Sequence, residues 1–451
     1  MKLTIIGGGG FRVPQIYEAL ASVDSNVPID KLCLYDVSAG RMNKVKAVID
    51  DLSGRATKNI EVEYSTDLDY ALRGASYIFS AMRVGGLESR VLDEKIALNL
   101  NVLGQETVGA GGLAYSLRTL PPALNLARRV SQLAPEAWVI NFTNPAGLIT
   151  EAMQSVMGER VVGICDTPIG LMRRVSKALV KDGRRFDFDY VGLNHLGWLR
   201  SIEVDGKDLL PNLMTDDNLL NSIEEVRIMG ADWVKTIGAI PNEYLYYYYH
   251  AREALQSIKA SQETRGEYLS RSQAEFYSEQ SEASFDSWSK IMHDRESSYM
   301  KESRKDSGRE SRLSEDAEDG GYQKVALDVI AGLSGGDPGR MILNVANGGK
   351  GRARIVPELN DEAVIEVPCK VTKDGIQPRQ VKPVAKDMLG LMIQVKSSEQ
   401  LILRATKEGS FDLAWRAFAT HPLIDSANIG KQLLVDYSEQ IPEIGQALRA
   451  G

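Results

Sequence analysis

The sequence KLTIIGGGGFRVP, residues 2–14, is the clearest indicator of the fold class. A short run of β-favouring residues ends in four consecutive glycines, and a helical pattern follows over residues 14–21. Strand, glycine turn and helix in this order are typical of a dinucleotide-binding unit, because the glycines let the backbone approach a pyrophosphate and the helix N-terminus favours its negative charge. The usual third glycine is replaced by Arg12 or Val13, so the motif is a variant. The alternative is a glycine-rich turn that binds nothing.

Strand-like and helical patterns alternate through the first third of the chain. The expected strands after the first cover residues 31–36, 60–67, 75–82, 137–145 and 161–168, and the expected helices cover residues 41–52 and 118–133. This alternation predicts parallel βαβ units and a Rossmann-like, doubly wound parallel sheet of the α/β class. Ligands of such sheets bind beyond the carboxyl ends of the strands. The loops at those ends read GGGG, YDV, RVGGLESR, NFTNP and CDTP.

The pattern changes after Asp189. Strands of a second layer or domain are expected over residues 190–209, helices over residues 223–277, strands again over residues 340–368, and helices at the C-terminus. We therefore predict an NAD-binding Rossmann-like domain over residues 1–165. A mixed α+β domain for substrate, metal and oligomerisation is expected over residues 166–451.

Residues 298–321, SYMKESRKDSGRESRLSEDAEDGG, are highly charged and poor in large apolar side chains. This composition favours a mobile loop or a solvated helix. A cap over a site or a subunit contact is the less favoured interpretation.

Composition excludes several functional classes. The chain has 451 residues, more than one typical core, with 43% hydrophobic residues and a net charge of −8, which is ordinary for a globular protein. The pI of about 5.4 argues against a general nucleic-acid binder. The N-terminal apolar run is too short for a signal peptide, and no run of roughly 18 apolar residues predicts a membrane span. Three cysteines without paired spacing predict a reduced, cytoplasmic protein.

The glycine loop suggests a set of dinucleotide contacts. These are Gly7, Gly8, Gly9, Gly10, Phe11 and Arg12. Asp36, at the end of the second expected strand, stands where an acid accepts a hydrogen bond from a ribose hydroxyl, which favours NAD over NADP.

Cys165 and His195 are a candidate metal pair. VGICDTP, residues 162–168, places a thiol and the Asp166 carboxylate at a strand end, and GLNHL carries His195 thirty residues later. A thiolate and an imidazole, with substrate oxygens completing the shell, make an open catalytic metal site. The alternatives are a small core cysteine, an aspartate that opens the next helix, and a hydrogen-bonded core histidine.

Seven ordered motifs resemble glycoside hydrolase family 4, the NAD- and manganese-dependent glycosidases. They are GGGG with its proline, RVGG, GQETVGAGG, NFTNPAG, GICDTP, GLNHLGW and IPNEYLYYYY. The resemblance implies that NAD⁺ takes hydride from carbon 3 of the sugar and that a divalent metal polarises the resulting carbonyl. It further implies that a tyrosine removes the carbon 2 proton, the glycosidic oxygen leaves, water adds and hydride returns.

The resemblance also implies roles for the residues that carry these motifs. Cys165 and His195 are the expected protein ligands of Mn²⁺ or another divalent metal. Tyr244 matches the base, and a nearby cation is a physical route to lower its pKa. Asp166 matches the acid that assists the leaving group or orients the metal site. Glu106 of GQET matches a motif near the metal.

Substrate contacts follow from the same resemblance. Asn144 is expected beside the sugar hydroxyls and the nicotinamide, and Asn194 beside the substrate. Family members act on sugars with a 6-phosphate, or less often on free or uronic sugars. Arg83, Arg90 and Arg265 are candidates to bind such a phosphate.

The predicted function is hydrolysis of 6-phospho-β-glucosides to glucose 6-phosphate and an aglycone. GLNHLGWLR and PNEYLYYYY resemble β-specific members, whereas Asp after the cysteine resembles the α-glucosidase branch, so α-anomers, galactosides and uronides stay open. The predicted assembly is a homodimer or homotetramer. The rivals are a 2-hydroxyacid dehydrogenase, which has no use for Cys165 with His195 and GQET, and a non-catalytic NAD-binding regulator, which has no need for Tyr244.

Overall fold

A computed structural model describes residues 1–180, 184–307, 312, 321–337, 339–349 and 351–449. Within them, thirteen strands form one sheet, and its first part is parallel in the order β3-β2-β1-β4-β5-β6. This order is that of a Rossmann dinucleotide-binding sheet. The strands are β1 (Lys2–Ile6), β2 (Lys31–Tyr35), β3 (Glu61–Ser65), β4 (Ala75–Ser80), β5 (Trp138–Asn141) and β6 (Val161–Gly163). The predicted doubly wound parallel sheet is therefore confirmed.

The second part of the sheet is antiparallel and continues the first without a break. Beyond β6 the order is β11-β12-β7-β8-β10, while β13 pairs with β12 and β9 with β8. These strands are β7 (Asp187–Leu193), β8 (Leu196–Val204), β9 (Lys207–Asp208), β10 (Ile240–Pro241), β11 (Arg340–Ala346), β12 (Val364–Thr372) and β13 (Gly375–Pro378). The later strands thus join the first sheet, and the division at residue 165 stays a prediction.

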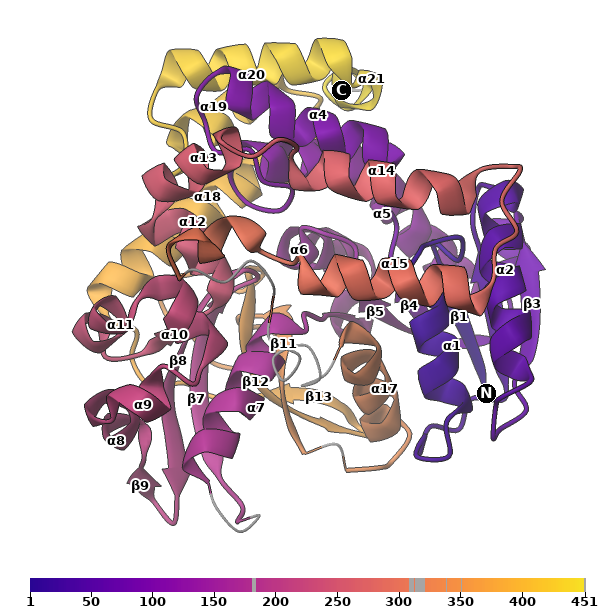
Figure 1. The fold of residues 1–451 in the computed structure, drawn as a ribbon, viewed down its shortest axis with the longest axis horizontal. Helices are drawn as coiled ribbons and strands as arrows, with labels where there is room; N and C mark the ends of the chain where they lie inside the picture. Colours follow the sequence, from indigo (N-terminus) through magenta and orange to yellow (C-terminus); the bar gives the residue numbers. More distant parts are fainter. Residues whose placement is uncertain (181–183, 308–311, 313–320, 338, 350, 450–451) are drawn as a thin grey trace.

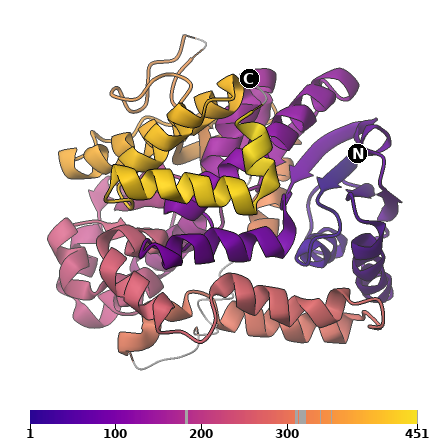
Figure 2. The same ribbon diagram turned by 90° about the horizontal axis from the view of Figure 1, so that it is seen from above.

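Helices cover both faces of the sheet (Figure 1). One face carries α1 (Val13–Ala21), α2 (Ala39–Ser53), α7 (Thr167–Leu179) and α17 (Tyr322–Leu333), whose apolar side chains share one buried core. The other face carries α3 (Leu68–Leu72), α5 (Gly109–Leu133), α6 (Ala146–Met157), and the C-terminal α18 (Lys386–Glu408), α19 (Phe411–Thr420), α20 (Ala427–Gln440) and α21 (Pro442–Ala447). Seen from above, the C-terminal helices lie beside α4 (Gly86–Asn99) (Figure 2). The sheet is thus the middle layer of three.

The remaining helices lie around the antiparallel part or across the carboxyl ends of the parallel strands. They are η1 (Gly158–Arg160), α8 (Leu210–Thr215), α9 (Asp217–Leu220), α10 (Glu224–Met229), α11 (Ala231–Ile237), η2 (Glu243–Leu245), α12 (Tyr246–Tyr249), α13 (Ala251–Lys259), α14 (Arg265–Tyr277), α15 (Phe285–Ser297) and η3 (Lys301–Ser307). α14 and α15 run side by side across the front in Figure 1 and pack against α2. None of the described helices is long and apolar enough to cross a membrane.

Three expectations need correction. α5 begins at Gly109 and not at Arg118, because glycines in its first turn allow a contact that a Cβ would prevent: a Cβ on Gly111 would lie 2.2 Å from the Gln105 carbonyl oxygen. The described residues of the range 347–363 form no named strand, since Asn347 there binds three backbone carbonyls of its own loop.

The third correction concerns the charged segment. The prediction that residues 298–321 are solvated is wrong for three of the described residues. Met300 and Arg304 are buried, and Arg312 pairs with Glu224. Residues 308–311 and 313–320 lie outside the described residues.

Candidate functional site

The carboxyl ends of the parallel strands meet in one row. Register pairs Ile6 with Tyr35 and Ser80, Ser80 with Asn141, and Asn141 with Gly163. The loops that follow these residues therefore emerge at one edge of the sheet, as the sequence predicted.

The glycine loop is shaped by close backbone contacts. Gly7 has φ +90°, and a Cβ on it would lie 2.5 Å from the Ala81 carbonyl oxygen. A Cβ on Gly8 would lie 2.7 Å from the Leu34 Cβ. The Asp36 carboxylate accepts hydrogen bonds from the backbone N–H groups of Gly9 and Ser38, both at 2.9 Å. Asp36 thus holds the glycine turn against the end of β2.

Three aromatic side chains donate to carbonyls of the same loop. Tyr277 donates to Gly9 (2.8 Å), Trp288 to Phe11 (2.7 Å) and Tyr322 to Arg12 (2.5 Å). The donors come from α14, α15 and α17. The loop is therefore held between the sheet and helices that lie more than 250 residues away in sequence.

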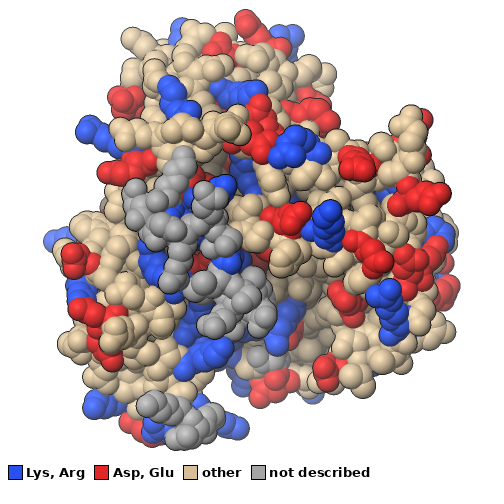
Figure 3. Space-filling view, viewed as in Figure 1, with Lys and Arg blue, Asp and Glu red and all other residues tan. Residues whose placement is uncertain are grey.

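A cavity of about 960 Å³ lies at this edge of the sheet. Its lining includes these predicted site residues: Arg12, Arg83, Arg90, Glu106, Asn144, Cys165, Asp166, His195, Tyr244 and Arg265. Gly7 to Phe11, Asp36 and Asn194 are not among its lining residues. Lys and Arg side chains are visible around the central hollow in Figure 3. The structure therefore brings most of the predicted catalytic and substrate residues together.

Cys165 is a buried thiol just beyond β6. Its Sγ lies 3.3 Å from the Thr167 Oγ1, which accepts a hydrogen bond from the Asn242 amide (2.8 Å). Burial, reinforced by Glu366 and Asp166, raises the pKa of the thiol well above its usual value. Without a nearby cation the thiol stays protonated at neutral pH.

Asp166 caps the N-terminus of α7 by position. Its carboxylate lies 3.7 Å from the guanidinium of Arg12, which belongs to the glycine loop. The ion pair connects the two strand-end loops that carry the candidate dinucleotide and metal residues.

His195 lies at the tip of the hairpin between β7 and β8, with φ +63°. Its ring stacks on that of Tyr244, with centroids 3.8 Å apart. Burial lowers the pKa of His195 to about 3, so the imidazole is neutral. Its Nδ1 is buried and has no hydrogen-bond partner among the described residues.

Tyr244 follows β10 and belongs to a short chain of hydroxyl and carboxyl groups. Its hydroxyl lies 3.1 Å from that of Tyr299, which donates to the Glu243 carboxylate at 2.7 Å. Burial and Glu243 raise the pKa of Tyr244. Burial and Glu224 raise the pKa of Glu243 to about 7. Sequence reasoning missed Glu243 and Tyr299; only the first lies in a quoted motif.

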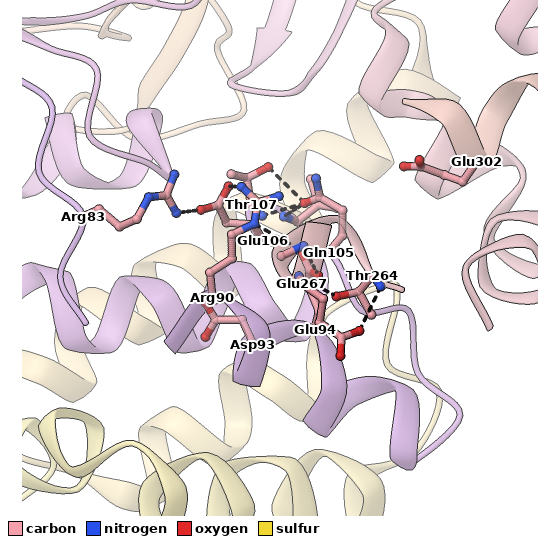
Figure 4. A network of polar contacts seen from close by, with 12 residues as sticks. Arg83, Arg90, Asp93, Glu94, Gln105, Glu106, Thr107, Thr264, Glu267 and Glu302 are labelled. Carbon is pink, nitrogen blue, oxygen red and sulfur yellow. Dashed lines mark hydrogen bonds and ion pairs between the residues drawn. The ribbon is translucent and has the colours of Figure 1, made fainter. Parts of the chain in front are cut away.

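Arg83 and Arg90 converge on Glu106 (Figure 4). Arg83 pairs with one carboxylate oxygen of Glu106 and Arg90 with the other, at 2.7 Å for Arg90. Arg90 also binds Glu94 (3.2 Å), whose second oxygen accepts from the Gly266 N–H (2.7 Å). Glu106 of the GQET motif thus neutralises charge on both predicted phosphate-binding arginines.

Asn144 and Asn194 differ in whether they line the cavity. Asn144 lines the cavity, whereas Asn194 accepts a hydrogen bond from the Ala146 backbone N–H at 3.1 Å. Asn194 therefore contacts the residue that opens α6, beside the loop that carries Asn144.

The arrangement fits a metal ion and a dinucleotide. Cys165 offers a thiol, and His195 a neutral imidazole with an unpartnered buried nitrogen, to one cavity. No group of three or more Cys, His, Asp or Glu side chains within the described residues is arranged to hold a metal. The two residues therefore suit an open metal site whose remaining ligands are substrate or water oxygens.

Two family models match the chain. The model described as "Family 4 glycosyl hydrolase" matches residues 2–181, and "Family 4 glycosyl hydrolase C-terminal domain" matches residues 190–424. A "Probable 6-phospho-beta-glucosidase" of Bacillus subtilis strain 168 is 30% identical over 97% of this chain and 96% of its own. A "Maltose-6'-phosphate glucosidase" of the same organism is 28% identical over 97% of this chain and 95% of its own.

Solved structures are similar over the whole length. A 6-phospho-β-glucosidase of Thermotoga maritima with manganese, NAD⁺ and glucose 6-phosphate gives a TM-score of 0.80 at 25% identity, covering 98% of this chain and 99% of its own. A 6-phospho-α-glucosidase from gut microorganisms, in complex with NAD and Mn²⁺, gives 0.80 at 26% identity, covering 98% of each chain. Relatives of both anomeric specificities thus share this fold.

Proposed function

The chain belongs to glycosyl hydrolase family 4, and from this premise we propose that it hydrolyses 6-phospho-β-glucosides to glucose 6-phosphate and an aglycone, with NAD and a divalent metal ion. The observation that carries the proposal is the grouping of Cys165, His195 and Tyr244 at one cavity, with Tyr244 stacked on His195. A plain hydroxyacid dehydrogenase needs no such grouping.

When bound, NAD would accept and return a hydride at carbon 3 of the sugar, and Mn²⁺ held by Cys165 and His195 would polarise the carbonyl at that carbon. Tyr244 removes the proton from carbon 2. Asp166 protonates or assists the leaving glycosidic oxygen. Burial raises the pKa of both Tyr244 and Cys165, so these roles require the metal cation, whose charge would favour both ionised forms.

The remaining predicted contacts complete the proposal. Gly7 to Arg12 and Asp36 bind the dinucleotide, with Asp36 on a ribose hydroxyl. Asn144 lies beside both nicotinamide and sugar, and Asn194 contacts the substrate. The division at residue 165, a homodimeric or homotetrameric assembly and a cytoplasmic location are further proposals. Three buried free cysteines support the last of these.

The β-anomer is the preferred assignment, with the α-anomer as the second candidate. The relative with 30% identity is named a probable β-glucosidase, while the relative with 28% identity acts on maltose 6'-phosphate by its name. Elimination after oxidation at carbon 3 depends on the acidity of carbon 2 and only weakly on anomeric configuration. Support for either anomer therefore has to come from turnover.

The test is hydrolysis of p-nitrophenyl β-glucoside 6-phosphate under reducing conditions, with and without NAD⁺ and Mn²⁺. The α-anomer and the unphosphorylated glucosides run alongside. We expect activity that needs both additions and leaves no net NADH. Faster turnover of the α-anomer would replace the β assignment. Net NADH with no released nitrophenol would contradict glycoside hydrolysis.

A further inference from the structure

Asn242 is a fully buried polar residue that the proposed mechanism does not use. It lies between β10 and Tyr244, it is 0% exposed, and it is not among the residues that line the cavity. A buried side-chain amide is expected to be hydrogen-bonded, because an unpaired donor or acceptor in the interior costs free energy. The partners of its polar groups therefore show which segments this residue holds together.

Two hydrogen bonds fix Asn242 against the segments that carry His195 and Tyr244. Its backbone N–H donates to the carbonyl of Gly197 (2.8 Å), in the strand that directly follows His195. Its Oδ1 accepts from the backbone N–H of Tyr244 (3.0 Å). A backbone N–H can only donate, so the side-chain atom that receives it must be the amide oxygen, and the other must be the amide nitrogen.

The amide nitrogen faces the segment that carries Cys165. Asn242 Nδ2 donates to the Oγ1 of Thr167 (2.8 Å), which in turn lies 3.3 Å from the Cys165 Sγ. Because the oxygen of Thr167 accepts from Asn242, its own hydrogen is available for the sulfur. A thiolate, the form of cysteine that binds a metal, can only accept, so the hydroxyl must donate to it. The direction of these hydrogen bonds therefore suits a metal-bound sulfur.

We infer that Asn242 is a positioning residue for the proposed reaction, which links the metal site to the base. Through Thr167 it orients the sulfur of Cys165, and through its Oδ1 it holds the backbone of Tyr244. The inference rests on the proposed function, because it takes Cys165 as a metal ligand and Tyr244 as the base. The alternative is a purely structural role, in which Asn242 caps η2 and ties β10 to α7. The outer partners of metal ligands tune metal affinity, so metal binding separates the two roles.

The experiment uses the full-length protein with substitutions along this link. Thr167→Val removes the hydroxyl and keeps the shape, whereas Thr167→Ser is the conservative partner that keeps the hydroxyl. Asn242→Asp keeps an oxygen for the Tyr244 N–H but loses the donor to Thr167, whose hydrogen then turns toward the new carboxylate. Asn242→Ala removes both contacts. Ser410→Ala is the matched control, because Ser410 caps α19 through the Leu413 N–H (3.3 Å) and is not a lining residue of the cavity.

Two measurements do not depend on turnover. Calorimetry gives the affinity for Mn²⁺, with the affinity for NAD⁺ recorded in parallel. Co²⁺ in place of Mn²⁺ gives a sulfur-to-cobalt charge-transfer band, which reports on hydrogen bonds to the Cys165 sulfur. Melting temperatures, kcat at saturating Mn²⁺ and exchange of the carbon 2 proton with solvent are measured on the same variants.

We expect Thr167→Val and Asn242→Asp to bind Mn²⁺ about 10- to 100-fold more weakly, the loss typical of an outer partner of a metal ligand. Their charge-transfer band should move to longer wavelength, because a sulfur without a hydrogen-bond donor gives up electron density more readily. Thr167→Ser should behave like the wild type, and Thr167→Val should keep its kcat within a few fold once Mn²⁺ is saturating.

The remaining variants separate the base from the metal. Asn242→Ala should lose Mn²⁺ affinity and also exchange of the carbon 2 proton, since the backbone of Tyr244 is no longer held. The affinity for NAD⁺ should stay the same in every variant. Ser410→Ala should lower the melting temperature and leave Mn²⁺ affinity and the cobalt band unchanged.

Two outcomes would overturn the inference. Unchanged Mn²⁺ affinity and an unchanged cobalt band in Thr167→Val and Asn242→Asp would leave Asn242 a structural residue. Equal losses in Thr167→Val and Thr167→Ser would show that the hydroxyl is not the group that acts on the sulfur. Neither measurement needs a glycoside. Absence of glucoside hydrolysis in a wild type that shows the cobalt band would therefore count against the proposed function alone.

Discussion

In the parallel half of the sheet, Cys165 lies just beyond the carboxyl end of β6, in the row of loops that also holds Arg12 and Asn144. In the antiparallel half, His195 lies at the tip of the β7–β8 hairpin and Tyr244 follows the two-residue strand β10. The parallel half collects its residues by a topological rule, since every strand ends at one edge. The antiparallel half reaches the cavity only because individual turns point there. The site therefore depends on the junction of the two halves.

The largest expected effect tests whether both halves supply the metal. Cys165→Ser and His195→Asn should each lower metal-dependent hydrolysis by more than about a hundredfold, because even the outer partners of metal ligands are worth about 10- to 100-fold in affinity or activity. NAD⁺ affinity should stay within a few fold, because the glycine loop is separate. Activity as a function of Mn²⁺ concentration and calorimetric NAD⁺ binding measure the two effects. An effect of Cys165→Ser alone would remove the antiparallel half from metal binding.

The second effect concerns Tyr244. Tyr244→Phe should lower kcat by about 10²- to 10⁴-fold, the usual worth of a general base. It should also stop exchange of the carbon 2 proton with solvent deuterium, followed by NMR. Tyr249→Phe is the control, because Tyr249 accepts from the Trp198 indole (3.0 Å) in the same tyrosine run. Unchanged exchange in Tyr244→Phe would remove the catalytic base from the antiparallel half.

The smallest effect is a pH dependence of stability. The pKa of Glu243 is raised to about 7 by burial and Glu224, so the folded protein holds this proton more tightly than the unfolded chain. Stability from this group is therefore present below about pH 4.5 and is lost as the pH rises to about 7. At pH 7.5 the melting temperature of Glu243→Gln should exceed that of the wild type, by about 2–4 °C for each kcal/mol gained in the free energy of unfolding. The difference should be smaller at pH 5. Equal differences at both pH values would contradict the raised pKa.

The same contrast explains what the sequence could predict. Strand order, glycine loop and strand-end loops follow from local patterns and one topological rule, so the row from Arg12 to Cys165 was predictable. The close pairing of Glu106 with Arg83 and Arg90 was not, because all three residues are polar and their partners depend on side-chain direction.

Tyr299 shows the limit most clearly. It lies two residues after α15, in the segment 298–321 whose charged composition favours solvation. Packing of α15 on the glycine loop, through Trp288 and Phe11, reverses that expectation. No periodicity or motif in the chain encodes this long-range contact.

The strand order also determines when each strand can find its neighbours during synthesis. β6 and β7 are complete once residue 193 has been made, but β11 and β12, which lie between them, begin about 150 residues later. At 5–20 residues per second, the ribosome needs about 9 to 36 seconds to complete both strands. Throughout that interval β6 and β7 each present an open edge, and an open edge is a template for pairing with another chain. The nascent chain therefore presents two strand edges open to pairing with another chain before its own β11 and β12 exist.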